Sequence, residues 1–345
     1  MQDTLSAVLA RYAALVDTQM RHVLAAYTEP HGFYGMMRYH LGWVDERLEP
    51  VAAARGKGLR AALLLLVNGA LGGDEATALP LAAAVELLHN FSLVHDDVED
   101  RGALRHHRPT LWALWGAPLS INAGDGLFAL AHLALLDSPL CRAAPDRFIG
   151  ILRQFEETTL RLCEGQHLDM TFESVNEVSV DEYLHMIAAK TAALIASAAW
   201  IGARAADATQ PQVQAAHDFG RELGLAFQMQ DDILGIWGDE ALTGKSAASD
   251  IAARKKTLPV LLAMTCAEHA ARDRLRTLYA QRNGDDAGPQ AIMAALDGTR
   301  ARDRTDEYLR RHWDAAMTAL ERIGLAPETR ERLRAFARLF VDRSA

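Results

Sequence analysis

The sequence has few cysteines and few aromatic residues. Three of its 345 residues are cysteines, Cys141, Cys163 and Cys266, and they form no CxxC or other metal-ligand spacing. Because disulfide scaffolds and structural zinc sites need paired cysteines, neither is expected, and a reduced, cytoplasmic setting is predicted. Aromatic residues make up 7% of a chain that is 50% hydrophobic, a balance that favours helix over sheet.

The sequence also lacks an excess of positive charge and a long apolar run. Its net charge is -9, which argues against a nucleic-acid partner, because nucleic-acid binders present basic surfaces. The N-terminus has no basic start, and Asp3 and Arg11 interrupt its apolar residues, so no signal peptide is expected. The longest apolar runs, 61–67 and 192–203, are shorter than the ~20 residues that span a bilayer, so no transmembrane segment is predicted.

Apolar residues recur at helical spacing along nearly the whole chain. The pattern predicts helices over residues 3–27, 61–71, 79 or 80 to 100, 117–137, 144–172, 180–205, 210–238, 256–284, 287–298, 301–323 and 327–343. Residues 29–42 are interpreted as a connection or a partner-facing arm, and residues 101–110 as a loop. No strand, low-complexity tract or long linker is evident, so one all-α domain over residues 1–345, with roughly ten or more helices, is predicted.

The helix that ends near residue 100 ends in acidic residues. Asp96 and Asp100 are four residues apart, so their carboxylates share one helix face, and Asp97 lies beside them. Two unit charges ~4 Å apart repel by roughly 1 kcal/mol in water and roughly 4 kcal/mol near a protein surface. We therefore expect a cation at this helix end.

A second predicted helix also carries apolar residues into an acidic pair, Asp231-Asp232. Gly244-Lys245, Asp250 and the basic stretch 254–256 follow it. Two acidic helix ends that face one pocket, with Lys and Arg nearby, suit Mg²⁺ bridging to phosphate oxygens, because Mg²⁺ prefers carboxylates, water and phosphates as ligands. The predicted ligand is a metal-bound diphosphate.

These motifs resemble, in order and spacing, those of the trans-isoprenyl diphosphate synthases, or polyprenyl synthetases. The resemblance runs from about residue 56 to residue 260. Five stretches carry it: Asp96 to Asp100 for the first aspartate-rich motif DDxxD, Arg105 with Pro109-Thr110 for RRGxPT, Lys190-Thr191 for KT, Phe227 to Asp232 for the second acidic motif, and Lys245, Asp250 and Lys255 for the positions that follow it.

The resemblance implies an isoprenoid synthase fold, an all-α bundle around a deep central cavity, and usually a homodimer. It implies that three Mg²⁺ ions hold an allylic diphosphate, whose carbocation is attacked by isopentenyl diphosphate. The implied metal ligands are Asp96, Asp97, Asp100 and Asp231, with Asp232 in support. The implied diphosphate ligands are Arg105, Lys190 and Lys245 with Gln228 nearby, and Lys57, Arg60, His106 and Lys255 complete the implied substrate-binding set.

Phe91 lies five residues before Asp96, a little more than one turn earlier on the same predicted helix. In the family that the chain resembles, bulk at this position limits the length of the growing chain. The resemblance therefore implies a product of C15–C20, with geranylgeranyl diphosphate favoured.

The chain departs from the family pattern mainly at the implied isopentenyl diphosphate site. Gly58 and Ala61 replace an Arg and the Pro of GKRxRP, His106 replaces the second Arg of RRG, and Gly69 stands where many members have a polar ligand. A neutral His offers one donor in place of the guanidinium fork, a loss of roughly 1.5–3 kcal/mol or ten- to a hundredfold in affinity. Gly235 also replaces the last carboxylate of the second acidic motif, and Asp239 lies one turn further on.

These departures leave two other hypotheses open. A terpene cyclase derived from this scaffold needs the metal site but no isopentenyl diphosphate. A non-catalytic subunit of a heteromeric synthase needs neither, although the intact first motif and the retained Arg105, Lys190 and Lys245 argue against it. His89 and His95 are interpreted as packed or hydrogen-bonded helix residues rather than metal ligands.

Overall fold

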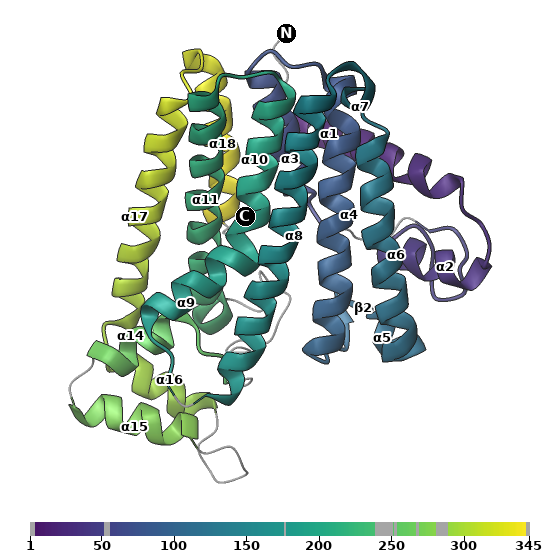
Figure 1. Cartoon of the computed structure of the whole chain (residues 1–345). Coiled ribbons are helices and arrows are strands. Elements are labelled where there is room, and N and C mark those ends of the chain that lie inside the picture. The colour runs from purple at the N-terminus through teal and green to yellow at the C-terminus, as the bar shows by residue number, and fades with distance from the viewer. Residues whose placement is uncertain are drawn as a thin grey trace. The chain divides into compact units, whose positions relative to one another are not determined.

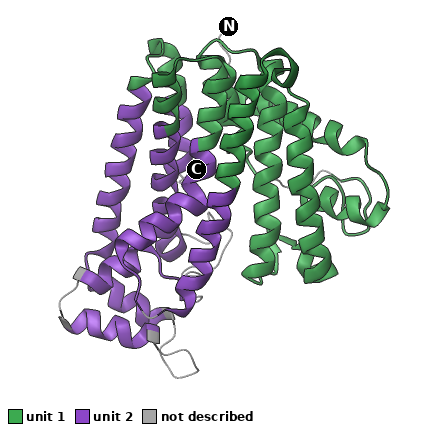
Figure 2. Ribbon diagram, in the orientation of Figure 1, with its two compact units in different colours: residues 1–159, 197–217, 322–333 green, residues 160–196, 218–321, 334–345 purple. Residues whose placement is uncertain are grey.

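The structure, a computed structural model, describes residues 4–51, 56–175, 177–238, 251, 254–266, 269–280 and 289–342. These residues are almost entirely helical, which confirms the predicted all-α class (Figure 1). The chain divides into two compact units (Figure 2). Unit 1 comprises residues 1–159, 197–217 and 322–333, and unit 2 comprises residues 160–196, 218–321 and 334–345. A single domain over residues 1–345 stays a prediction.

The elements follow one another along the chain as one succession of helices interrupted by a short hairpin. Those that begin in unit 1 before residue 160 are α1 (Leu5–Ala25), α2 (His31–His40), α3 (Leu59–Ala70), α4 (Glu75–Glu99), β1 (Leu104–Arg105), β2 (Arg108–Pro109), α5 (Leu111–Trp115), α6 (Ala117–Leu136), α7 (Leu140–Ala143) and α8 (Pro145–Ser174). Those that follow are α9 (Val180–Ile187), η1 (Ala188–Ala192), α10 (Ala193–Ala205), α11 (Gln210–Trp237), α14 (Leu258–Cys266), α15 (His269–Ala280), α16 (Pro289–Asp297), α17 (Ala301–Arg322) and α18 (Pro327–Val341).

Helix α4 forms the centre of unit 1. It packs against α1, α3 and α6, and α6 runs beside it along its length (Figure 1). Residues 81–88 are buried on every face, as expected of a helix enclosed by others. The helix begins at Glu75 rather than near Pro80, because Asp74 caps it by accepting the Thr77 N–H at 2.9 Å. The Asp74 carboxylate, as a local hydrogen-bond acceptor, therefore determines where α4 begins, and Pro80 lies inside the helix.

The two segments expected to be connections contain regular structure. Residues 31–40 form α2, and residues 104–109 form the antiparallel hairpin β1–β2, so the expectation of no strand was wrong at this point. His106 and His107 make the two-residue turn with φ of 50° and 61°, the left-handed backbone that such tight hairpins need. Arg108 fixes the hairpin to α2 by donating to the Tyr39 carbonyl at 3.0 Å. This hydrogen bond helps to position Arg105 on the other strand of the hairpin.

In unit 2 the helix predicted over residues 180–205 is interrupted by a π-helical turn, η1, at Lys190-Thr191. Such turns occur mostly as local bulges in α-helices and often at functional sites. Gly165 of α8 lies directly against this turn, since a Cβ added at Gly165 would be 2.2 Å from the Lys190 backbone nitrogen. The glycine therefore allows two helix backbones to meet beside a predicted site residue.

Two apolar clusters form the core of unit 2. One joins α9, η1, α11 and α14 and includes Tyr183, Met229 and Leu258. The other joins the end of α11 to the helices that follow it and includes Val260 and Leu275. Asp232 is buried and hydrogen-bonds to two members of the first cluster, Tyr183 and Leu258, so this carboxylate is held among apolar residues.

Within the described residues, three helical stretches are long and apolar enough to cross a membrane, judged by length and composition. They are Glu75–Glu99, Ala117–Leu136 and Val180–Ala205, and 61%, 44% and 83% of their most apolar windows are buried inside the protein. The sequence argument from uninterrupted apolar runs was too narrow, because helices with a few polar residues also reach this length. The absence of a transmembrane segment stays a prediction.

We predict opposite effects for two glycine substitutions in α8. Gly165→Ala should lower the free energy of unfolding by at least ~2 kcal/mol, because the new methyl group meets backbone that cannot rotate away. Gly150→Ala should raise it by up to ~1 kcal/mol, since its nearest neighbour, Arg204 Nε, is 4.0 Å away and alanine favours helix. Urea unfolding measures both, and equal effects would show that the close approach at Gly165 is not real.

Candidate active site

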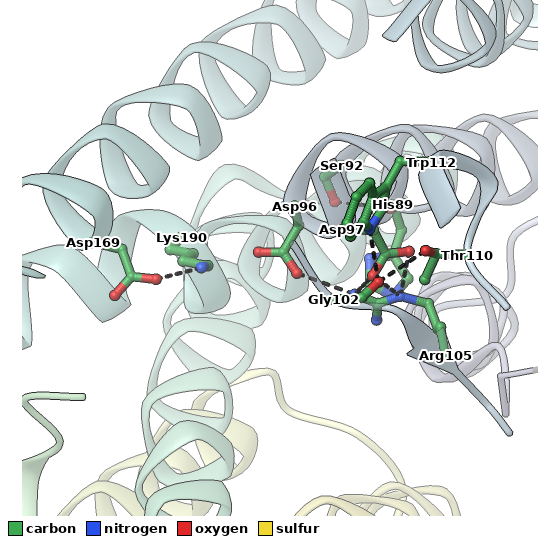
Figure 3. Close-up of polar contacts among 10 residues, drawn as sticks. All are labelled: His89, Ser92, Asp96, Asp97, Gly102, Arg105, Thr110, Trp112, Asp169 and Lys190. Atoms are coloured by element: carbon green, nitrogen blue, oxygen red, sulfur yellow. Dashed lines mark hydrogen bonds and ion pairs between the residues drawn. The ribbon is translucent and has the colours of Figure 1, made fainter. Parts of the chain in front are cut away.

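The acidic end of α4 is organised by Arg105. Its Nε donates to both carboxylate oxygens of Asp97 at 2.9 and 3.0 Å, and its Nη2 donates to Asp96 Oδ2 at 3.1 Å (Figure 3). The cation expected beside this cluster is therefore, in the protein alone, a guanidinium group. Asp97 is buried and Asp100 is exposed, so the three carboxylates differ strongly in their access to solvent.

Burial raises the pKa of Asp97, and the hydrogen bonds and charge of Arg105 oppose that shift. Because both Asp97 oxygens are engaged by Arg105, Asp97 acts first as the residue that orients the guanidinium group. Its role as a direct metal ligand stays a prediction. Asp96 uses one oxygen for Arg105 and keeps about a quarter of its side chain exposed, at 24%.

The backbone after Asp100 is held by side chains from the segment that leads into α5. Thr110 Oγ1 and Trp112 Nε1 both donate to the Gly102 carbonyl, at 2.8 and 2.9 Å (Figure 3). The Gly102 N–H in turn donates to the Asp97 carbonyl at 3.0 Å. The Thr of the RRGxPT-like motif therefore fixes the loop that carries Arg105, and Trp112 has a structural role.

Basic side chains surround His89 in unit 1. Arg60 Nη1 lies 3.0 Å from His89 Nε2, and because a guanidinium group can only donate, Nε2 must be the acceptor and the ring is neutral. Burial and then the charges of Arg60, Arg105, His40 and His106 lower the pKa of His89 well below its ordinary value. The fold thus brings two predicted diphosphate ligands, Arg60 and Arg105, and the departure His106 within electrostatic reach of one buried ring.

Lys57 and the two glycine departures lie near the start and end of α3. Lys57 is exposed, and Gly58 is the left-handed residue before the first turn, with φ of 60°. A Cβ at Gly69 would meet only the Tyr12 hydroxyl, at 3.8 Å, among the atoms of the described residues. The role of Lys57 in substrate binding stays a prediction.

In unit 2, Asp232 is the centre of a buried hydrogen-bond network. Its Oδ2 accepts from Tyr183 Oη at 2.5 Å and from the Leu258 N–H at 3.0 Å. Its Oδ1 accepts from Gln228 Nε2 at 3.2 Å, and Gln228 Oε1 accepts from Thr191 Oγ1 at 2.8 Å. The carboxylate thereby ties together α9, η1, α11 and the start of α14.

Burial raises the pKa of Asp232 to about 7, against the hydrogen bonds from Tyr183, Leu258 and Gln228 that lower it. A buried carboxylate whose oxygens accept three hydrogen bonds is an internal anchor. Its supporting role in metal binding stays a prediction, as does that of Asp231, which is half-buried beside it. The network was not foreseen, because nothing in the sequence pairs Tyr183 with Asp232.

Lys190 forms an ion pair on the π-helical turn. Its Nζ donates to Asp169 Oδ2 of α8 at 2.5 Å, and about a quarter of each side chain is exposed (Figure 3). Lys255 lies before α14 with its carbonyl 3.4 Å from Tyr279 Oη. The remaining expected residues of this region, Lys245, Asp250 and Asp239, lie outside the described residues.

The acidic side chains fit a hard divalent cation. In the part of the chain that the structure describes, no group of three or more His, Cys, Asp or Glu side chains is arranged to hold a metal ion. Mg²⁺ does not need such a group, because it keeps several waters and is bound by one or two carboxylates together with substrate phosphates. The carboxylate oxygens of Asp96 and Asp100 in unit 1, and separately that of Asp231 in unit 2, are therefore ligands of the kind that Mg²⁺ uses when it binds together with a diphosphate.

Phe91 belongs to an aromatic row between α4, α6 and α8 in unit 1. Its ring lies 4.7 Å from His95 and 5.1 Å from Phe128, and Phe128 in turn contacts His132. The interpretation of His95 as a packed residue agrees with this contact. Phe91 is half-buried, so it is not sealed within the core.

The comparisons with known proteins bear on this arrangement. The family model for polyprenyl synthetase matches residues 42–296. The chain belongs to the polyprenyl synthetase family. The matched residues include both acidic pairs, Arg105 and Lys190. The family resemblance read from the sequence motifs is thereby confirmed.

Polyprenyl synthetase relatives cover nearly the whole chain. This chain is 41% identical over 344 residues to a (2E,6E)-farnesyl diphosphate synthase of Mycobacterium tuberculosis. The match covers 98% of this chain and 93% of that protein. The chain is 42% identical over 275 residues to a geranylgeranyl diphosphate synthase of the same species, 79% of this chain and 76% of that protein. The crystal structure of a polyprenyl synthetase from Streptomyces coelicolor is similar with a TM-score of 0.89 and 35% identity, covering 98% of this chain and 100% of that one.

We predict that His40 makes the protein less stable in acid. Burial, with the charges of Arg105, His106 and Arg108 around it, lowers the pKa of His40 to about 3, although Asn90 hydrogen-bonds to it. The unfolded chain takes up this proton near pH 6.5 and the folded chain does not, so stability falls as pH drops from about 7 toward 3. The expected slope from this group is up to roughly 1 kcal/mol per pH unit.

The variant His40→Gln isolates this effect. Urea unfolding of both proteins at several pH values between about 7 and about 5 should show a shallower loss of stability for the variant. The contribution of His89 is common to both proteins and cancels in the difference. Parallel pH dependences would mean that His40 is protonated in the folded protein.

Proposed function

We propose that the chain condenses an allylic diphosphate with isopentenyl diphosphate to give a trans-prenyl diphosphate of C15–C20. Its family consists of prenyl diphosphate synthases, so the chain is a transferase of this class. The observation that carries the proposal is the family match over residues 42–296. This range contains every described residue that we assign to the two diphosphates. The names of the two relatives from Mycobacterium tuberculosis support the product range.

The residues of the chain supply charge and orientation. When the allylic C–O bond breaks, the departing pyrophosphate gains negative charge, and Arg105 and Lys190 are proposed to stabilise it by fixed positive charge. Arg60 and His106 are proposed to bind the diphosphate of isopentenyl diphosphate, whose double bond attacks the allylic carbon. The proton lost from the new chain goes to the departing pyrophosphate, as in the family that the sequence resembles.

Mg²⁺ is the proposed cofactor, in line with its general use in this family. We propose three ions, with Asp96, Asp97, Asp100 and Asp231 as ligands and Asp232 in support. When bound, Mg²⁺ acts as a Lewis acid on the phosphate oxygens of the leaving group. Among these carboxylates, Asp96, Asp100 and Asp231 are the more accessible, which supports direct coordination by them.

Phe91 is proposed to limit the length of the product. Its ring lies one turn before the acidic end of α4, and Phe128 of α6 supports it at 5.1 Å. An aromatic pair of this kind is rigid, so it resists displacement by a growing isoprenoid tail. Products well beyond C20 would contradict this role.

One assay tests the function. Purified protein with Mg²⁺ is incubated with dimethylallyl, geranyl or farnesyl diphosphate, each with and without isopentenyl diphosphate, and both diphosphates and hydrocarbons are analysed. Elongated diphosphates formed only with isopentenyl diphosphate are expected. Asp96→Ala should lower kcat at least ~100-fold, the scale of losing one charge-stabilising group, while Asp137→Ala, an exposed carboxylate at the end of α6, should not.

Other outcomes of this assay would contradict the proposal. A hydrocarbon or alcohol from one allylic diphosphate alone would identify a cyclase. No turnover until a second protein is added would identify a non-catalytic subunit. Full activity of Asp96→Ala would remove this carboxylate from the metal site.

We also propose that the chain forms a homodimer through the outer face of α6. This helix exposes four large aliphatic side chains, Leu119, Ile121, Leu133 and Leu136, although its other face is buried against α4. Exposed apolar groups that gather on one helix are typical of protein–protein contacts. Because every copy of the chain presents the same face, a second copy is the proposed partner.

Leu136→Glu should shift this dimer toward monomer, because it places a charge on the apolar face while the side chain is 53% exposed in the single chain. Leu104→Glu, at an exposed position on the hairpin, should leave the oligomeric state unchanged. Sedimentation velocity distinguishes the two variants. A wild-type protein that is monomeric at micromolar concentration would contradict the proposed dimer.

A cytoplasmic location is proposed for the enzyme. Cys141 and Cys163 are free thiols in the structure, which is the usual state of cysteines in a reducing compartment. Cell fractionation would test it, and recovery of the protein with membranes after a salt wash would contradict it.

A further inference from the structure

Residues 254–258, the basic segment, lie in unit 2, begin with three basic residues and lead into α14. The motif resemblance assigns only the middle basic residue, Lys255, to substrate binding, and its side chain is half-buried. The segment ends at Leu258, whose N–H donates to Asp232 Oδ2 at 3.0 Å. The two basic neighbours of Lys255 also make contacts to other parts of unit 2, and these contacts decide how firmly Lys255 is held.

Lys256 binds the C-terminal end of α8. Its Nζ donates to the Phe172 carbonyl at 2.6 Å and also to the carbonyl of Val175, just beyond the last residue of the helix. The last four carbonyl groups of a helix have no partner within the helix, and a cation beside them is favoured by the helix dipole. Lys256 therefore caps α8 and joins it to the basic segment.

The backbone on the other side of Lys255 is held by α15. Arg254 has φ of 53°, a left-handed conformation that residues other than glycine adopt rarely and that persists where the surroundings fix it. Its Nη1 donates to the carbonyl of Leu278, one of the last four residues of α15. Tyr279 Oη donates to the Lys255 carbonyl at 3.4 Å. Both basic neighbours of Lys255 therefore bind the carbonyl end of a helix.

The end of α8 that Lys256 binds also holds Lys190. Asp169, three residues before Phe172, accepts from Lys190 Nζ at 2.5 Å (Figure 3). Two of the predicted diphosphate ligands of unit 2 are thus tied to the last turns of one helix, Lys190 by its own side chain and Lys255 through its neighbour. A shift of the basic segment relative to α8 would move Lys255 away from Lys190.

We propose that Lys256 is a positioning residue, which ties the basic segment to the end of α8 and so holds Lys255 in place for the allylic diphosphate. The inference rests on the proposed function of the chain. The allylic diphosphate is the expected substrate because Lys190, the other lysine held by α8, is assigned to it. The residues assigned to isopentenyl diphosphate, Arg60 and His106, belong to unit 1.

A purely electrostatic role for Lys256 predicts a different pattern. A positive charge that acts on the substrate through space does so independently of Lys255, so the effects of removing the two side chains would multiply. If Lys256 acts by holding Lys255, its removal matters little once Lys255 has lost its ammonium group. A double-mutant cycle on the two lysines therefore distinguishes the two roles.

The test compares Lys256→Met, Lys255→Met and the double variant, since methionine is a long, unbranched side chain without charge. We expect Lys256→Met to raise KM for the allylic diphosphate about tenfold in the wild-type background and less than about twofold in the Lys255→Met background. KM for isopentenyl diphosphate should change less than about twofold. Calorimetric titration with pyrophosphate and Mg²⁺ should show the same pattern without turnover. A similar rise in both backgrounds, or no rise in either, would overturn the inference.

The matched control is Arg276→Met. Arg276 is exposed and pairs at 3.3 Å with Glu177, which closely follows α8, so its removal also takes one positive charge from this part of unit 2. Neither KM should change more than about twofold, and a rise equal to that of Lys256→Met would overturn the inference. If Lys256→Met does not fold, Lys256→Gln replaces it in the same cycle. A rise of about threefold confined to the wild-type background would then support the inference, and no rise would overturn it.

The proposed function can fail separately. If the wild-type protein forms no elongated diphosphate and does not bind pyrophosphate with Mg²⁺ in the titration, both proposals fail. If the wild type elongates its substrate and Lys256→Met retains the wild-type KM, the inference alone fails.

Discussion

The structure depends on carboxylates that are buried at helix ends and must be hydrogen-bonded there. Leaving a carboxylate in an apolar environment without partners costs several kcal/mol, about as much as a small protein can lose. Asp97 in unit 1 meets this constraint through Arg105, and Asp232 in unit 2 through Tyr183 and Gln228. Each partner is thereby fixed, because moving it would expose the uncompensated charge.

This constraint explains why the acidic residues come in adjacent pairs. Consecutive residues on a helix point about 100° apart, so one member of a pair can face the core while the other faces outward. Asp97 is buried and Asp96 is half-buried, and the same difference separates Asp232 from Asp231. The buried carboxylate of each pair therefore anchors the hydrogen bonds of its own unit, and its neighbour is more accessible to solvent. The sequence motif treats the two members of each pair alike, although their burial differs.

The sequence predicted the features that depend on the helical spacing of apolar residues and on the order of the motifs along the chain. Apolar residues at helical spacing placed most helices, and the ordered acidic and basic motifs identified the family. The sequence failed where a distant partner decides the local structure. The hairpin at residues 104–109 is joined to α2 by a hydrogen bond from Arg108, and α4 starts early because Asp74 offers an acceptor before Pro80. Tyr183 lies on an otherwise apolar helix face, and its partner Asp232 is 49 residues away in the chain.

The geometry of Arg105 shows how an acidic site can be stable both before and after a cation binds. Two of its nitrogens reach Asp97, with Nη2 2.8 Å from Oδ1 and Nε at 2.9 and 3.0 Å, while Asp96 receives one bond. If Asp96 turns to a cation, Arg105 loses one partner and keeps its bidentate contact with Asp97, so its position is unchanged. A lysine in place of Arg105 lacks the planar fork and would have to choose between the two carboxylates. The planar fork of an arginine therefore allows Arg105 to contact Asp96 and Asp97 at the same time.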